Sequence, residues 1–447
     1  MDKIQLLREC REMLKGAGKE VRAQIAALVD EDSFVELAAF TFSKDALFSE
    51  EAQGEGVVTG FATIGGYPFY LVAQNFNAFQ GGLSKANCEK IAKALNAAEK
   101  SGTPVVYLLQ SHGVRVGEGV NVLEGVAELL LKATQLKGSV LQFAILGGEV
   151  YGSSAVLASL ADVVLFTEGA VLSLPSPFVL SAKAGKNMKP AEVGGYGAMA
   201  KANLPAIAVK DLGEAASKIL AISDIVRLAE VEAELNEPAP ALNASVTAEE
   251  LEKLLENAVE LGANAYPEMK TYLARVCGIA TCAVVMNGVR VNEGNLKKLK
   301  AFAEFACCYG LPFVTFVDCL GVDATLEVAS SAVLKEMGEY LNVLDAMDTA
   351  KIAVVTGKAI GLGYSLFAAK SVGFDYTFAL ATAQIALFES EAGAEIEFSG
   401  ADRAKLAERY AEENADPFNA AKGGYLDDIV EPQFVKQYLI AALQTVK

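Results

Sequence analysis

The chain has 447 residues, of which 52% are apolar, and a formal net charge of −18. This length predicts two or three domains with large buried cores. The acidic balance argues against binding to nucleic acid or to an anionic membrane surface.

Cysteine usage and hydropathy predict a cytoplasmic protein. The seven cysteines are scattered without a C-x-x-C pair, which indicates reduced thiols in a cytosol. The N-terminus lacks the apolar core of a signal peptide, and no continuous apolar segment is long enough to insert into a membrane. With one histidine and no metal-binding motif, we expect no metal site and no Ser-His-Asp triad. Catalysis is therefore expected to use backbone groups.

The first half of the chain predicts an α/β fold. An amphipathic helix is expected over residues 3–30, and two β-rich runs flank the turn Gly65-Gly66 as in a hairpin. A continuously apolar strand over 104–109 is typical of a parallel sheet that is buried on both faces. Helices and strands then alternate, as α/β folds require. The remaining expected elements are a helix over 84–101, a helix over 120–136, a strand over 141–146, a glycine loop over 147–153 and a small-residue helix to about 160.

A linker separates the two halves. Residues 232–248 are rich in Pro, Ala and Asn and have no apolar period. We therefore predict an N-terminal domain over 1–234, a linker over 235–247 and a C-terminal domain over 248–447. The second domain is expected to open with a charged helix, ELEKLLENAVELG, and to end with a helix near 433–446.

The same pattern occurs twice along the chain. Pro104 in the first buried strand is matched by Pro312, 208 positions later, and Gly152 is matched by Gly361. A repeat of this length indicates a duplicated domain. In each copy a glycine loop opens a helix, so unpaired N–H groups face whatever binds there. Such groups stabilise an enolate or a tetrahedral oxyanion, although tight packing of helix on sheet also selects glycine.

Several blocks of sequence resemble the motifs of one known family. Residues 54–60, GEGVVTG, resemble its GDGVVTG, and 416–432 resemble its specific ending NPYxAAxxGYIDDVIEP. Further blocks stand where the family has DSGGARIQEG, GPCAGG, FVDVPG and RKAYGGAY, namely 110–119, 148–153, 316–321 and 357–364. Together these blocks resemble the carboxyltransferase family of biotin-dependent acyl-CoA carboxylases and decarboxylases.

The resemblance implies a fold and a reaction. The expected fold is α/β, with two tandem crotonase-like domains, each a ββα superhelix. The expected reaction moves a carboxyl group between biotin and the α-carbon of an acyl-CoA, with no side-chain nucleophile. The oxyanion hole for the enolate falls on Gly152 and Ser153, and the hole for the biotin ureido oxygen falls on Leu362 and Gly363. The ligand-contacting residues that it implies are His112, Gly113, Gly148, Gly321 and Gly361.

The resemblance also implies partners. Biotin would be carried on a separate biotin carboxyl carrier protein, and a coenzyme A thioester would be the substrate. Biotin carboxylase or decarboxylase membrane subunits would complete the complex. In the family the site lies between the first domain of one subunit and the second domain of its partner, so we expect a homodimer or a trimer of dimers. No nucleic acid and no direct membrane insertion are expected.

Three residues depart from glycines of the family, namely His112, Ser153 and Leu362. Each keeps its backbone N–H, but Leu362 adds an isobutyl group beside the expected biotin oxygen. Two interpretations of His112 stay open: an acid-base or ligand-contacting group, or a loop residue whose ring packs aside. Arg115 is predicted to fix its loop through an ion pair, with Glu118 as the partner.

Two other functions stay open. The altered glycine loops favour a non-catalytic scaffold subunit that pairs with an active one. A crotonase-type hydratase or hydrolase is the third interpretation, but those enzymes place a carboxylate beside the acyl carbons, and only Glu149 lies near a glycine loop.

Overall fold

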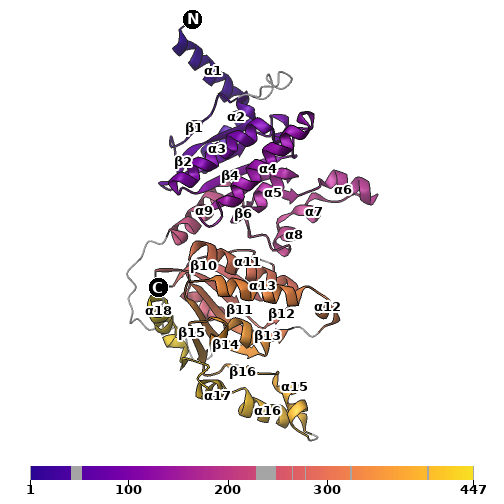
Figure 1. The fold of residues 1–447 in the computed structure, drawn as a ribbon, viewed down its shortest axis with the longest axis vertical. Coiled ribbons are helices and arrows are strands. Elements are labelled where there is room, and N and C mark those ends of the chain that lie inside the picture. The colour runs from indigo at the N-terminus through magenta and orange to yellow at the C-terminus, as the bar shows by residue number, and fades with distance from the viewer. Residues whose placement is uncertain are drawn as a thin grey trace. The chain divides into compact units, whose positions relative to one another are not determined.

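The computed structural model describes residues 2–41, 53–227 and 248–445, apart from 264, 277, 323, 324, 400 and 401. The chain divides into two compact units, Met1–Ser223 and Asp224–Lys447 (Figure 1). The predicted linker, 235–247, lies outside the described residues. No helix in the described ranges has both the length and the apolar character needed to cross a membrane.

The first unit is built on a sheet of order β1-β2-β3-β4-β5-β6-β8, and β7 pairs with β5 off this path. The hairpin β2-β3 is antiparallel and turns at Gly65-Gly66, as predicted, whereas β3 to β6 are parallel neighbours. The strands are β1 Val35–Leu37, β2 Val57–Ile64, β3 Tyr67–Gln74, β4 Val105–Ser111, β5 Gln142–Tyr151, β6 Val163–Phe166, β7 Val171–Ser173 and β8 Ala206–Ala208.

Helices α3, α4 and α5 bury their apolar residues together with those of the parallel strands in one continuous core. Leu95, Leu129 and Leu157, one from each helix, are fully buried there. The single helix predicted over 3–30 is two helices that meet at Gly18. The helices of this unit are α1 Lys3–Ala17, α2 Lys19–Leu28, α3 Lys85–Ser101, α4 Val120–Gln135, α5 Ser153–Ser159, α6 Pro177–Ala184, α7 Pro190–Gly194, α8 Tyr196–Lys201 and α9 Leu212–Val226.

The second unit repeats the architecture. Its sheet has the order β17-β15-β14-β13-β11-β10-β9, with β12 beside β13 and β16 beside β14. The strands are β9 Glu256–Glu260, β10 Met269–Val276, β11 Ile279–Met286, β12 Val289–Val291, β13 Phe313–Val322, β14 Lys351–Ile360, β15 Tyr376–Leu380, β16 Gln384–Ala386 and β17 Asp428–Val430. The helices are α10 Ala248–Leu251, α11 Glu293–Tyr309, α12 Leu326–Ala329, α13 Val333–Ala346, α14 Leu362–Phe367, α15 Ser390–Glu397, α16 Arg403–Asn414, α17 Pro417–Lys422 and α18 Val435–Thr445.

The duplication extends to single hydrogen bonds. Ser84 caps α3 in a capping box closed by Asn87, and Asn292 caps α11 in a box closed by Asn295. Each pair of equivalent residues is 208 positions apart. Because such a box satisfies orphan N–H groups at a helix start, it fixes where the helix after each hairpin begins.

Two sequence predictions are wrong in detail. Most of the expected glycine loop 147–153 is strand, because β7 offers a parallel partner that pairs Glu149 with Val171 and Tyr151 with Ser173. The charged helix expected after 250 ends in a short turn at Glu252–Leu254. The residues that follow form β9, because pairing with β10 outweighs their helical preference.

Candidate functional site

A glycine turn opens the last helix of each repeat. Gly152, with φ 61° and ψ −132°, precedes α5, and Gly361, with φ 53° and ψ −122°, precedes α14. Only glycine adopts such angles without strain. A second glycine with positive φ lies close by in each unit: Gly113 follows β4, and Gly321 lies near the end of β13. A Cβ atom added to Gly152 would lie 3.5 Å from the Cα of Gly113, and one added to Gly321 would lie 3.2 Å from the carbonyl oxygen of Ile360. In each unit the backbones of the two segments therefore approach each other closely.

The free N–H groups of the first turn come from Ser153 and Val114. The N–H of Gly152 donates to the carbonyl oxygens of Ser173, at 3.2 Å, and Leu174, at 3.1 Å. The N–H of Gly152 is therefore already in use, which corrects the expectation that it donates to a ligand. Gly152 instead forms the turn before α5. Within the described ranges, the N–H groups of Ser153 and Val114 have no acceptor.

The N–H of Val114 is left unused by a short parallel bridge. Leu83 donates to the carbonyl oxygen of Gly113, and Arg115 donates to that of Leu83, both at 2.8 Å. In a parallel bridge these bonds use the groups on either side of Val114, so its own N–H faces away from Leu83. On that side β4 pairs with β5 through Ser111 and Val150, close to the turn.

The second turn has the same construction. Gly361 donates its N–H to the carbonyl oxygen of Ala386 at 2.8 Å, so Leu362 and Gly363 carry the leading N–H groups of α14. Gly363 is buried, and a Cβ atom there would lie 2.7 Å from the Sγ atom of Cys319. Burial raises the pKa of Cys319 to about 11, so it packs there as a neutral thiol. Leu362 differs from Gly363 in that it is 46% exposed, which is unusual for a large apolar residue.

Two glutamines hold the first turn in place. Gln74 donates its side-chain amide to the Oγ atom of Ser154 at 3.1 Å, and its Oε1 atom accepts from the N–H of Gln110 at 3.2 Å. Gly148 packs against the Gln110 side chain, whose amide would have to shift for a Cβ atom at that position, since the Nε2 atom would lie 2.8 Å away. These contacts fix the start of α5 to the ends of β3 and β4.

Arg115 ties two left-handed turns together directly beside Val114. It donates to the carboxylate of Glu55 at 2.6 Å and to its carbonyl oxygen at 3.1 Å, and its guanidinium lies 4.6 Å from the centre of the Phe79 ring. Both Glu55 and Phe79 have positive φ. The predicted ion pair is therefore present, but Glu55 is its main partner and Glu118 lies farther away, at 3.9 Å.

His112 is held on four sides. Its Nδ1 atom lies 3.2 Å from the Oε1 atom of Gln80, and its Nε2 atom lies 3.0 Å from the Oε2 atom of Glu149. Its ring packs against those of Phe76 and Tyr151, with centroids at 5.1 and 5.4 Å. Because both nitrogens are engaged, neither is free for proton transfer, which argues against an acid-base role for His112.

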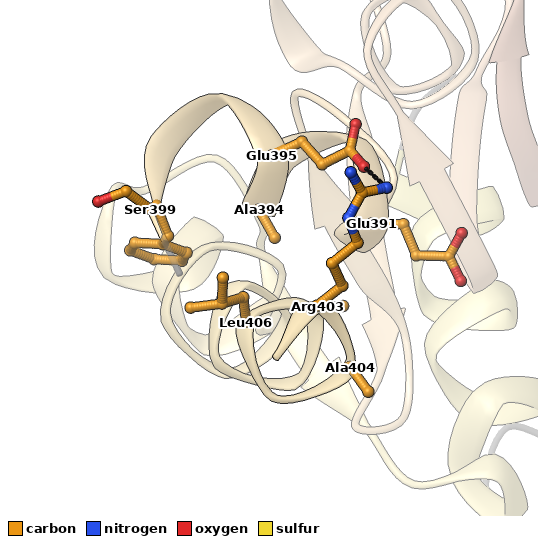
Figure 2. Close-up of a pocket in the computed structure, with 9 residues that line it drawn as sticks. Glu391, Ala394, Glu395, Ser399, Arg403, Ala404 and Leu406 are labelled. Atoms are coloured by element: carbon orange, nitrogen blue, oxygen red, sulfur yellow. Dashed lines mark ion pairs between the residues drawn. The ribbon is translucent and has the colours of Figure 1, made fainter. Parts of the chain in front are cut away.

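A cavity with a charged lining lies elsewhere, between α15 and α16 of the second unit. It measures roughly 630 Å³, and the ion pair of Glu395 with Arg403, at 2.6 Å, lies at its rim (Figure 2). None of the predicted site residues lines it. Nor do three His, Cys, Asp or Glu side chains converge as metal ligands would anywhere among the described residues.

Sequence reasoning missed three residues that build the first turn: Val114, Gln74 and Glu55. The signal for Val114 was present, because Gly113 and Gly321 stand 208 positions apart, as the two buried strands do. Glu55 and Gln74 reach the turn only through the tertiary fold, so no spacing pattern points to them.

Comparison with known proteins gives a consistent result. The family model of the carboxyl transferase domain matches residues 15–275 and 260–447. The chain is 26% identical to the methylmalonyl-CoA decarboxylase subunit alpha of Veillonella parvula, over 99% of this chain and 95% of that one. It is also 26% identical to the mitochondrial propionyl-CoA carboxylase beta chain of Homo sapiens, over 92% of this chain and 82% of that one.

A solved structure shares the fold. The hexameric transcarboxylase 12S, crystallised with methylmalonyl-coenzyme A and methylmalonic acid bound, superposes with a TM-score of 0.91 at 23% identity. The match covers 99% of this chain and 95% of that one. The predicted fold class, two tandem crotonase-like α/β domains, is thereby confirmed.

Proposed function

The chain belongs to the carboxyl transferase domain family, and from this premise we propose that it moves a carboxyl group between biotin and the α-carbon of an acyl-CoA. The observation that carries the proposal is the duplicated glycine turn. Each repeat presents free backbone N–H groups at a helix start, where the backbones of two segments approach each other closely. This arrangement stabilises a developing oxyanion and needs no nucleophile.

The N–H groups of Val114 and Ser153 would hold the thioester oxygen of the acyl-CoA. Charge gathers on that oxygen when the α-carbon becomes an enolate, so donors placed in advance lower the barrier to its formation. Losing one such donor typically costs about 3–4 kcal/mol of transition-state stabilisation. The braced side chains of Gln74 and Arg115 keep both donors in place.

The leading N–H groups of Leu362 and Gly363 would hold the ureido oxygen of biotin. Biotin, when bound, supplies the nitrogen that carries the carboxyl group. The residues present fit this use, because these N–H groups start a helix and Gly363 admits no side chain. Leu362 is exposed, and its isobutyl group would narrow the approach to them.

The proposal extends to partners and assembly. Biotin would arrive on a biotin carboxyl carrier protein, and a biotin carboxylase or decarboxylase membrane subunits would complete the reaction. Because transcarboxylase 12S forms a hexamer, we propose a homodimer or a trimer of dimers for this chain. Light scattering of the purified protein distinguishes these assemblies.

Carboxyl transfer itself tests the function. The purified chain is incubated with a carrier domain that bears labelled carboxybiotin and with acetyl-, propionyl-, butyryl- or crotonyl-CoA. In the reverse direction it is incubated with an uncarboxylated biotinylated carrier domain and labelled malonyl-CoA. Transfer to or from at least one thioester is expected. The absence of transfer with every thioester would sink the proposal.

A second candidate function is a scaffold subunit without activity of its own. Leu362 favours it, because a large exposed side chain stands where the first unit has the smaller Ser153. Purification from the native source decides between the two functions. A second carboxyltransferase chain with unaltered glycine loops in the complex supports the scaffold, and an active homomer rules it out.

A further inference from the structure

Two residues with aromatic rings precede, in the sequence, the two residues that carry the free N–H groups of the first unit. His112 lies two residues before Val114, and Tyr151 lies two residues before Ser153. Their ring centroids are 5.4 Å apart, with an angle of 32° between the ring planes. The equivalent positions of the second unit hold the aliphatic residues Leu320 and Ile360. The two repeats therefore share a backbone site but differ in the side chains that border it.

The ring pair is rigid. Gln80 and Glu149 engage the two nitrogens of His112, and the ring of Phe76 packs edge-on against it. Tyr151 is 5% exposed, and burial together with the nearby Glu149 carboxylate raises its pKa to about 12, so it stays neutral near physiological pH. Moving His112 aside would break both of its polar contacts.

The ring pair also borders open space. The His112 side chain keeps 34% of its surface exposed. Apart from atoms of the adjoining residues, the described atom within 4 Å of a Cβ added at Gly113 is the carbonyl oxygen of Tyr151, at 3.9 Å. For a Cβ added at Gly152 it is the Cα of Gly113, at 3.5 Å. Little therefore packs against these glycines beyond their chain neighbours, and the partly exposed ring of His112 adjoins Gly113 in the chain.

We propose that the His112–Tyr151 ring pair sets an upper limit on the length of the acyl group that is held by Val114 and Ser153. This inference rests on the proposed function, since it assigns an acyl-CoA to that turn. A fixed wall excludes additional methylenes, and one methylene too many in a tight pocket changes discrimination by about 10-fold or more. His112 is accordingly a specificity-determining residue of the first turn.

Calorimetric binding of acetyl-, propionyl-, butyryl- and hexanoyl-CoA to the intact protein tests the inference without requiring turnover. The variant His112→Gly removes the wall, and we expect it to raise the affinity for butyryl-CoA relative to propionyl-CoA by about 10-fold. The matched control, Leu320→Gly, changes the equivalent position of the second unit and should leave that ratio unchanged. His112→Asn, which keeps a short polar side chain for Glu149, should give an intermediate ratio and serves if the glycine variant does not fold.

The outcomes separate the two levels of inference. If acyl-CoAs bind but both His112 variants keep the wild-type length preference, the wall is wrong and the proposed function stands. If Leu320→Gly shifts the preference as much as His112→Gly, the acyl group does not lie at the first turn. If no acyl-CoA binds to the wild-type protein, the proposed function fails and the wall fails with it.

Discussion

Lys90 and Lys298, which stand 208 positions apart, make the same buried contact in the two units. The ammonium group of Lys90 donates to the carbonyl oxygens of Gly54, at 2.9 Å, and Val57, at 2.6 Å. That of Lys298 donates to Ala265, at 2.9 Å, and to Met269, the first residue of its hairpin, at 2.7 Å. Each lysine thus fixes the helix after the hairpin to the strand that begins the hairpin.

These lysines give the protein a pH-dependent stability. Burial lowers the pKa of both groups to about 8, from 10.5. Between those values the unfolded chain holds a proton that the folded chain has released, so the free energy of unfolding rises with pH across this window. The variant Lys90→Met lacks this rise. The stability of the wild type relative to Lys90→Met should therefore increase by up to about 3 kcal/mol between about pH 7 and about pH 10.

Urea unfolding of both proteins at several pH values measures this difference. Buried tyrosines titrate in both proteins, so their effect cancels in the comparison. Lys93→Met, on the exposed face of the same helix, is the matched control and should show no such change. A constant difference between wild type and Lys90→Met across the range would contradict the assignment.

Ser153 separates the role of a backbone N–H from that of a side chain. Proline is tolerated at the first position of a helix, which Ser153 occupies, but it has no N–H. Ser153→Pro should therefore keep α5 and lower kcat for carboxyl transfer by roughly 10²- to 10³-fold. Ser153→Gly keeps the N–H and should retain most of the activity. Equal losses in both variants would show that the hydroxyl, and not the N–H, matters.

Arg115 carries the stability of the loop beside the first turn. Arg115→Met leaves the carboxylate of Glu55 buried without its cation, and such a loss costs about 3–5 kcal/mol. Urea denaturation should show this destabilisation. Arg403→Met breaks an ion pair whose arginine is 82% exposed, and its unfolding midpoint should match that of the wild type. A wild-type midpoint for Arg115→Met would mean that other contacts hold the loop.

Local patterns were enough to predict most of the order of elements in the first repeat. The apolar run from Val105 and the helix from Lys85 follow from periodicity and capping residues, which act over a few neighbours. The strand character of Glu149 and Tyr151 did not follow, because it depends on pairing with β7, a segment about twenty residues farther along the chain. The same reason explains why Val259 lies in a strand although its neighbours favour a helix.

The candidate site shows the same division. The glycine turns at Gly152 and Gly361 could be predicted because these glycines occupy matching places in the two repeats. Their backbone angles explain why both positions hold glycine. The choice of donor was not predictable, since it depends on which N–H groups already have an acceptor. The N–H of Gly152 already donates to the carbonyl oxygens of Ser173, the last residue of β7, and of Leu174, which follows it.

Leu362 allows a test of whether biotin binds at the second turn. Its exposed side chain lies at the first position of α14, so shortening it should cost little stability. Leu362→Ala should lower KM for free biotin several-fold without changing KM for the acyl-CoA, because only the approach to the second turn is widened.

Leu362→Pro removes the N–H at the same position and supplies the complementary measurement. Steady-state rates with free biotin should fall by about 10²-fold, as expected for the loss of one donor to a charged oxygen. The binding of acyl-CoA, measured by calorimetry, should not change, because that ligand is assigned to Val114 and Ser153. If Leu362→Pro instead weakens acyl-CoA binding and Ser153→Pro weakens biotin use, the two turns have the opposite assignment.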